Sequence, residues 1–182
     1  MKKLLFSLFV VSITCVGFAQ KEKEVPTPNL PINEDTKLIT YQNVVTQKGS
    51  PQELYDRAML WVKKFYKNTA EVIKKSDRDA GVIEMRSSVR IYSVQNGSRT
   101  PRNNVYYTFK LECRQDRYRY TITDFKERAE AATPIEVWLD KNHVKWYAGQ
   151  FEYLNQIDEQ IKELIESLEK GMNPVIEKKD EW

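Results

Sequence analysis

The clearest pattern in the chain is a strict alternation of apolar and polar side chains in its middle third. Residues 82–92 alternate polar side chains with the apolar residues Ile83, Met85, Val89 and Ile91. Residues 105–114 alternate in the same way, and residues 117–123 do so again after the polar pair Gln115-Asp116. A period of two is typical of a β-strand with one buried and one solvated face. The pattern therefore predicts three strands, the last two joined by a short hairpin turn.

An antiparallel sheet with one apolar face needs a layer that covers it, and two segments of the chain have helical periodicity. Ser50, Pro51 and Glu53 form a capping-box sequence with proline in the first turn, which predicts a helix over residues 51–66. From Gln150 onward, apolar residues recur every three or four positions at Phe151, Leu154, Ile157, Ile161, Leu164, Ile165 and Leu168. This stripe predicts a second amphipathic helix, which we expect Gly171 to close as a C-cap.

The segments between these elements are assigned from composition and turn-forming residues. They predict a strand over 37–46, a short strand over 71–76, a tight turn over 77–81, a long polar loop over 93–104, and a short helix followed by a strand or loop over 134–147. The element order is then strand, helix, four strands, helix. We therefore expect a two-layer α+β fold, in which two helices cover one face of one twisted antiparallel sheet.

Several packing and turn motifs resemble those of a known family. They are the strand at 38–45, the helix start at 50–55 with Trp61-Val62, the turn at 77–81, the strand at 118–125 and the final helix at 161–168. Spread over residues 38–172, they resemble exported bacterial proteins of unknown function that have a TATA-binding-protein-like (TBP-like) fold. The resemblance implies that fold, with the order β-α-β-β-β-β-α. It implies no catalytic residue, because the family has none to carry over.

The N-terminus has the three parts of a secretory signal peptide. Lys2-Lys3 precede an apolar stretch over 4–16, and Ala19-Gln20 follows as a cleavage site. We expect residues 1–20 to be removed and the protein to be exported to the periplasm or the extracellular space, with no transmembrane anchor after processing. The alternative is a lipoprotein anchored through Cys15, although Thr14 stands where a small residue is expected.

Composition divides the rest of the chain into three parts. Residues 21–36 contain three prolines and few apolar side chains and are predicted to be a linker, residues 37–172 one domain, and residues 173–182 a charged tail. Once the signal peptide is removed, Cys113 is the only cysteine, so an intramolecular disulfide is impossible. We expect its thiol to be buried as a small apolar group, because it lies on the apolar side of its strand.

Few residues suggest catalytic chemistry. The sequence contains no Gly-x-Ser-x-Gly, Cys-x-x-Cys, His-Glu-x-x-His or glycine-rich phosphate loop. Its one histidine, His143, lies among polar residues typical of an exposed loop. Asp77 and Asp79 have the spacing of a turn and lack the further oxygen ligands of a calcium loop. We therefore expect neither an enzyme nor a bound metal or cofactor.

The polar face of the predicted sheet carries six basic residues, namely Arg86, Arg90, Lys110, Arg114, Arg117 and Arg119. Such a row can bind phosphates or other anions. Nucleic acid is not the expected partner, because Glu84 and Glu112 share the face and export separates the protein from cytoplasmic nucleic acid. The formal net charge of +3 is also small, and two of the lysines belong to the signal peptide.

The sequence thus favours a non-enzymatic binding module whose partner is an envelope protein or an anionic ligand, with the oligomeric state left open. The alternative is a small-ligand binder that uses a cleft between the sheet and the C-terminal helix. The two interpretations differ in what they predict for the space between that helix and the sheet. A filled core favours the interaction module, and an open apolar pocket favours ligand binding.

Overall fold

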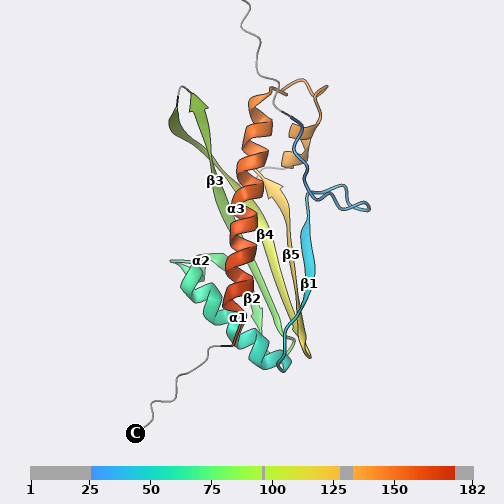
Figure 1. Cartoon of the computed structure of the whole chain (residues 1–182), viewed down its shortest axis with the longest axis vertical. Helices are drawn as coiled ribbons and strands as arrows, with labels where there is room; N and C mark the ends of the chain where they lie inside the picture. The colour runs from blue at the N-terminus through green and yellow to red at the C-terminus, as the bar shows by residue number, and fades with distance from the viewer. Residues whose placement is uncertain (1–25, 96, 128–132, 175–182) are drawn as a thin grey trace, which may run out of the picture.

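A computed structural model describes residues 26–95, 97–127 and 133–174. The predicted signal peptide with Cys15 lies outside the described residues, as does the predicted tail from residue 175 onward. Five strands form one antiparallel sheet in the order β1-β5-β4-β3-β2 (Figure 1). The elements are β1 (Tyr41–Thr46), α1 (Pro51–Phe65), α2 (Thr69–Val72), β2 (Ile73–Asp77), β3 (Val82–Gln95), β4 (Ser98–Arg114), β5 (Arg117–Lys126), the 3-10 helix η1 (Ile135–Leu139) and α3 (Gly149–Gly171).

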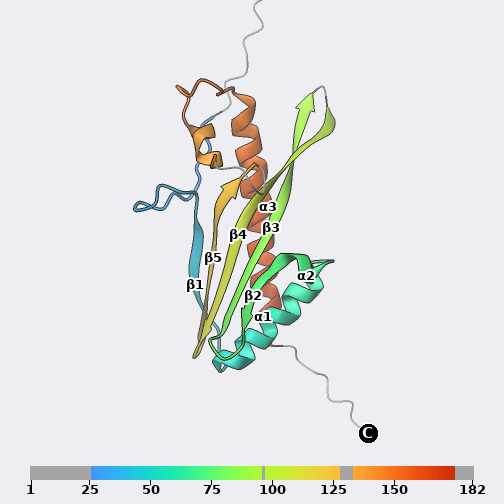
Figure 2. The same cartoon turned by 180° about the vertical axis from the view of Figure 1, so that it is seen from behind.

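Both long helices cover the same face of the sheet. Figures 1 and 2 show α3 running along the sheet, with α1 beside its C-terminal half. The Trp61 ring of α1 meets the Phe109 ring of β4 edge-on, with the ring centroids 5.9 Å apart. The buried core between the layers includes Trp61, Ile83, Met85, Phe109, Leu111 and Ile161. The predicted two-layer α+β fold is therefore confirmed.

α1 begins with the capping box that its sequence predicts. The backbone N–H of Glu53 donates to Ser50 Oγ at 3.2 Å, and the backbone N–H of Ser50 donates to Glu53 Oε2 at 2.7 Å. The bond from the Ser50 backbone lowers the pKa of the Glu53 carboxyl, because it favours the ionised form. The first turn of α1 is thereby fixed, and with it the direction in which the helix crosses the sheet.

Polar side chains of α3 occupy an edge of the sheet that no described strand covers. β2 pairs with β3 only between Val82 and Met85, so the second half of β3 is open on that side. Gln156 Nε2 donates to the carbonyl oxygen of Tyr92, and Gln156 Oε1 accepts from the Tyr92 N–H, each at 2.9 Å. Gln160 Nε2 donates to the carbonyl oxygen of Arg90 at 3.1 Å. These bonds hold α3 against β3 and satisfy backbone groups of the edge.

The prediction of a long loop over 93–104 is wrong. β3 continues to Gln95 and β4 starts at Ser98, so the two strands form one long hairpin, and Gly97 in its turn has a φ of 79°. The sequence Asn96-Gly97 is a strong hairpin signal. The alternation that marks the rest of both strands is missing here because most side chains near the tip are exposed on both faces. The register also shifts between Arg90 and Tyr92.

The predicted role of Gly171 as a C-cap is also wrong. α3 runs through Gly171, and the cap is Met172, whose φ of −80° is helical. A Cβ atom on Gly171 would lie 2.5 Å from Cδ1 of Trp61. The glycine therefore lets the last turn of α3 approach α1 closely, and the indole Nε1 of Trp61 donates to Ser167 Oγ at 3.1 Å in the same contact.

The first strand begins four residues later than predicted. Residues 33–37 form a turn, in which Asn33 Oδ1 accepts the backbone N–H groups of Asp35 and Thr36 at 3.1 and 2.9 Å. Lys37 has a φ of 60°, and an isolated bridge joins Ile32 to Ile39. Asparagine stabilises turns through such side-chain bonds, and this competes with an extended backbone here.

Other element boundaries differ by a few residues. The short helical turn α2 precedes β2, which starts at Ile73 rather than at residue 71, and β5 continues past residue 123 to Lys126. Residues 134–147 contain the short helix η1 followed by turns, in agreement with the prediction of a helix followed by a strand or loop. η1 packs against the core through Ile135 and Trp138, both buried.

Glu136 of η1 is a half-buried acid, and one of its two carboxylate oxygens has no hydrogen-bond partner among the described residues. Its Oε1 accepts the backbone N–H of Ile39 at 2.7 Å, and its buried Oε2 has no hydrogen-bond partner among the described residues. Burial raises the pKa of Glu136, and the nearby Asp124 raises it further. The fold therefore favours the protonated acid, which makes this contact sensitive to pH.

We expect Gly171→Ala to destabilise the protein by about 1–3 kcal/mol, the usual effect of overpacking a helix contact. The added methyl group would push against the Trp61 ring. Unfolding in urea measures the effect, and Lys170→Ala on the exposed side of the same turn is the control. Equal midpoints for Gly171→Ala and the wild type would contradict this role of the glycine.

We expect Ile161→Asp to destabilise the fold by more than about 3 kcal/mol, because a charge without a partner would enter the core. Ile161 is 0% exposed in the centre of α3. Arg90→Ala on the opposite face should change stability by less than about 0.5 kcal/mol. Denaturant unfolding of both variants tests the layering, and similar losses in the two would refute it.

We expect Glu136→Gln to stabilise the protein at pH 7 and to have a smaller effect near pH 4. Folding raises the pKa of Glu136. At low pH the carboxyl is protonated in both the folded and the unfolded chain, so the raised pKa does not reduce the free energy of unfolding there. As the pH rises through the ordinary glutamate pKa, the unfolded chain releases its proton first, so the folded state loses stability. Urea unfolding of the variant and the wild type at both pH values measures this difference, and a difference that does not depend on pH would contradict it.

Candidate functional site

The face of the sheet that the helices leave open carries all six basic residues predicted for an anionic partner. This face lies in front of α3 in Figure 2. β3 contributes Arg86 and Arg90, β4 contributes Lys110 and Arg114, and β5 contributes Arg117 and Arg119. Their positions alternate with buried residues of the same strands, which directs these side chains away from the helices.

Glu112 neutralises part of this face. Arg119 Nε donates to Glu112 Oε2 at 2.8 Å, and Lys110 Nζ lies 3.4 Å from Glu112 Oε1. Burial acts to raise the pKa of Glu112, but the hydrogen bond from Arg119 and the charges of both basic residues outweigh it, so the pKa is lowered. These three residues form an ion-pair network near the end of the sheet where β4 turns into β5.

Arg86 and Arg90 lie farther along β3. Arg86 is placed opposite Thr108, and Arg90 Nε donates to Asn104 Oδ1 at 3.1 Å. Thr108 precedes Arg114 by six residues on β4, a separation of about 20 Å in a strand. The six basic residues therefore share one face without forming one compact cluster.

Three of them do gather at one end of the sheet, where β4 turns into β5. Arg114 lies directly opposite Arg117 in the register, and Arg119 follows on β5. We call Arg114, Arg117 and Arg119 the arginine corner. Beside it is a hollow of about 140 Å³, lined by these arginines together with Val44, Glu112 and Tyr118. The hollow has room for a small anionic group, and guanidinium groups bind such groups through paired N–H donors.

The hairpin turn holds the arginine corner in place. Asp116 has a φ of 55°, and its carboxylate Oδ1 accepts the backbone N–H of Gly49 at 3.1 Å. The Asp116 N–H donates to the carbonyl oxygen of Gly49 at 3.0 Å. The one acid of the turn thus binds the segment before α1, and within the described residues neither Arg114 nor Arg117 has an ion-pair partner.

The other residues with potential chemistry occupy structural positions. Cys113 is 3% exposed, and burial raises the pKa of its thiol to about 12, as expected for a small core residue. His143 lies half-buried in a turn, where its Nδ1 accepts the backbone N–H of Lys145 at 3.3 Å. Asp77 Oδ1 accepts the backbone N–H of Ala80 at 2.9 Å in the predicted turn. In the described part of the chain, no three histidine, cysteine or acidic side chains are grouped so that they could hold a metal ion.

A polar cluster near the tip of the β3–β4 hairpin was not predicted from the sequence. Tyr153 Oη of α3 lies 2.9 Å from Ser93 Oγ and accepts from Arg102 Nη1 at 3.2 Å. Burial acts to raise the pKa of Tyr153, but hydrogen bonds from Ser93 and Tyr147 and the charge of Arg102 lower it. The residues are far apart in sequence, and two of them lie in the segment assigned to a loop. The cluster ties the hairpin to α3.

The space under α3 is filled by its own apolar stripe. Ile157, Ile161, Leu164 and Leu168 are all at most 3% exposed. Two hollows lie instead at the margins of this helix. One is a groove of about 820 Å³ between the outer sides of α1 and α3, and the other is a groove of about 660 Å³ between β1 and the end of α3.

None of the helices in the described part of the chain has the length and apolar character that a membrane crossing requires. No curated protein matches the sequence. Several crystal structures resemble the fold. A TBP-like protein from Parabacteroides distasonis aligns with a TM-score of 0.58 and 16% identity, over 74% of this chain and 92% of that chain. A DUF4468 family protein from Bacteroides ovatus aligns with a TM-score of 0.61 and 17% identity, over 81% of this chain and 93% of that chain.

At these identities the two structures show a common fold and carry no information on activity. The sequence itself matches, over residues 41–128, the family described as "Domain of unknown function (DUF4468) with TBP-like fold". That range runs from the start of β1 past the end of β5, so it includes the whole sheet and the arginine corner. The chain therefore carries a DUF4468 domain with a TBP-like fold.

Proposed function

We propose that this protein is an exported, non-enzymatic binding module of the cell envelope, and that its arginine corner binds an anionic group of the partner. The N-terminal signal pattern supports export, because it combines a basic start, a short apolar stretch and a cleavage site. The partner is a protein or other envelope component that carries carboxylate, sulfate or phosphate groups at its surface.

The observation that carries the proposal is the pairing of Arg114 with Arg117. Like charges directly opposite each other on neighbouring strands destabilise a sheet. Both side chains are exposed, and neither has an ion-pair partner among the described residues. The pair therefore does not stabilise the folded sheet. An anion placed between the two guanidinium groups would neutralise both charges.

The acidic residues next to Arg114 and Arg117 are already bound elsewhere, which also supports anion binding by these two arginines. Glu112 already binds Arg119 and Lys110, so it is not available to neutralise the two outer arginines. Asp116 is bound to the backbone of Gly49. An incoming anion would thus meet two guanidinium groups with free donors at the rim of a small hollow.

The small-ligand interpretation has less support. The apolar stripe of α3 fills the space under the helix, and a pocket for a small molecule is usually a well-formed apolar cavity. The groove between β1 and α3 is an open margin lined by Glu166, Glu169 and Lys170 besides strand residues. Such a surface suits a contact with another macromolecule better than the enclosure of a small ligand.

The proposal is tested by capturing envelope components on immobilised protein. We expect Arg114→Glu/Arg117→Glu to reduce the captured partner at least about tenfold, because charge-assisted hydrogen bonds contribute about 1.5–3 kcal/mol each. The variant keeps a pair of like charges across the strands, so its stability should stay close to that of the wild type. Capture by the wild type should also fall as salt is raised from about 0.05 to 0.5 M, because the contact is exposed to solvent.

Lys67→Glu/Lys145→Glu is the matched control, since it makes the same change in net charge at exposed positions outside the sheet. It should capture the partner as the wild type does. Equal capture by both double variants, with both folded, would show that the arginine corner is only a solvated part of the sheet.

A further inference from the structure

The groove between α1 and α3 lies on the side of the helix layer that faces away from the sheet. Its volume is about 820 Å³, and its floor includes Trp61 and Gly171, where the two helices touch. Leu60 and Phe65 form part of its α1 wall, and Glu163 and Glu166 form part of its α3 wall. The groove is separate from the arginine corner, which belongs to the opposite face of the sheet.

Two large apolar side chains at this groove are exposed. Leu60 is 61% exposed and Phe65 is 42% exposed, although both belong to α1, whose inner face is fully buried. The Phe65 ring stacks on the Trp61 ring with the centroids 5.1 Å apart. The apolar surface thus continues from the core to the outside of the helix layer, and it would gain stability from being covered.

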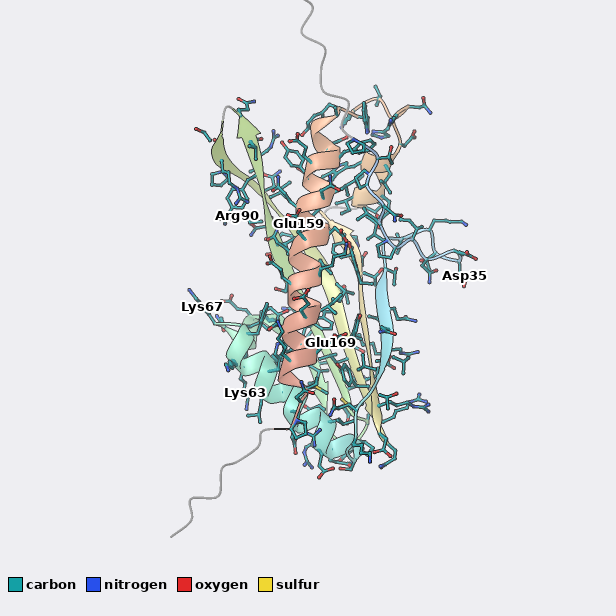
Figure 3. All side chains as sticks on the ribbon, viewed as in Figure 1. Asp35, Lys63, Lys67, Arg90, Glu159 and Glu169 are labelled. Carbon is teal, nitrogen blue, oxygen red and sulfur yellow. The ribbon has the colours of Figure 1, made fainter. Side chains whose placement is uncertain are left out.

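The two walls of the groove have opposite charges. Lys64 lines the α1 wall, with Lys63 next to it in the sequence. Glu163, Glu166 and Lys170 line the α3 wall, so that wall keeps a net negative charge. Figure 3 shows Lys63 and Lys67 on the α1 side and Glu159 on α3, whereas Glu169 lies toward the groove between β1 and α3. The layer of helices is therefore basic on one side of the groove and acidic on the other.

These charges are poorly neutralised within one chain. Among the described residues, Lys63, Lys64 and Glu163 have no ion-pair partner. Glu166 reaches Lys170 only at 3.9 Å, and both side chains are largely exposed, so this pair contributes little. The groove separates the charges of its two walls, so Lys64 and Glu163 of one chain do not form an ion pair.

A surface with one basic and one acidic wall around an apolar centre is complementary to itself. In a two-fold dimer the same patch of both subunits meets, and when the axis runs along the groove the α1 wall of one copy faces the α3 wall of the other. The exposed apolar residues then lie at the centre, and opposite charges meet at both sides. A partner with a different charge pattern would leave one wall unpaired.

We propose that the groove between α1 and α3 binds a second copy of this chain. Leu60 and Phe65 of one copy enter the groove of the other, and Lys64 of each copy faces Glu163 of its counterpart. The helix layers form the centre of the dimer, and the two open sheet faces point outward. The dimer would present two arginine corners, so that it could bind a partner with repeated anionic groups through both. The proposal does not depend on the function assigned to the arginine corner.

Sedimentation equilibrium of the purified protein tests the proposal. We expect a dimer for the wild type and a monomer for Leu60→Glu, with unfolding midpoints that are similar at matched low concentration because Leu60 is mostly exposed. A wild type that stays monomeric up to about 1 mM, the weak end of measurable association, would overturn the proposal. So would a dimer that Leu60→Glu does not weaken.

Exchanging the charges of Lys64 and Glu163 tests whether these two residues meet across the dimer. Lys64→Glu and Glu163→Lys should each weaken the dimer at least tenfold, and the double variant should recover most of the loss, because the opposite charges meet again in reversed order. Lys145→Glu, an exposed change outside the groove, should leave the dimer unchanged. A double variant as weak as the single ones would contradict the contact between Lys64 of one copy and Glu163 of the other. Arg114→Glu/Arg117→Glu should remain dimeric, so the two proposals fail independently.

Discussion

The structure depends on one packing constraint, which is that α3 must lie on the apolar face of the sheet. Its buried stripe, centred on Ile161, belongs to one core with the odd-numbered residues of β3 and β4. Side-chain bonds fix its position at both margins: Tyr41 Oη donates to Asp158 Oδ1 at 2.8 Å near β1, and Gln156 binds the open edge of β3. With the helix fixed in this way, one face of the sheet is covered except at the hairpin tip, and the other remains in contact with solvent.

Elements with a strong period or a defined cap could be predicted from the sequence. The hairpin at Gln115-Asp116, the capping box at Ser50 and the stripe of α3 each rest on local physics, and each is confirmed. The predictions that were wrong concern positions whose structure is decided by contacts between distant parts of the chain. Gly171 follows a basic last turn as a C-cap would, but its position is decided by the Trp61 ring. The hairpin tip lacks alternation because most of its side chains are exposed on both faces, and its contact with α3 through Tyr153 is polar.

The candidate site was predictable only in outline. Alternation placed the six basic residues on the open face, but the cross-strand register decides which of them meet. The register puts Arg114 opposite Arg117 and pairs Arg119 with Glu112, so one pair keeps its charge and the other is neutralised. The groove between the helices has no local signature at all, because Lys64 and Glu163 come together only when α1 and α3 pack. The fold thus separates a basic sheet face from a helix face of mixed charge.

We propose the arginine corner, and not the basic face as a whole, as the anion-binding part of the sheet. The most direct measurement is an NMR titration of the protein with inorganic phosphate, following the Nε–Hε signals of its arginine side chains. We expect saturable shifts for Arg114 and Arg117, with much smaller changes for Arg90, which shares the face but binds Asn104. Shifts of equal size for all three arginines, or none that saturate, would contradict it.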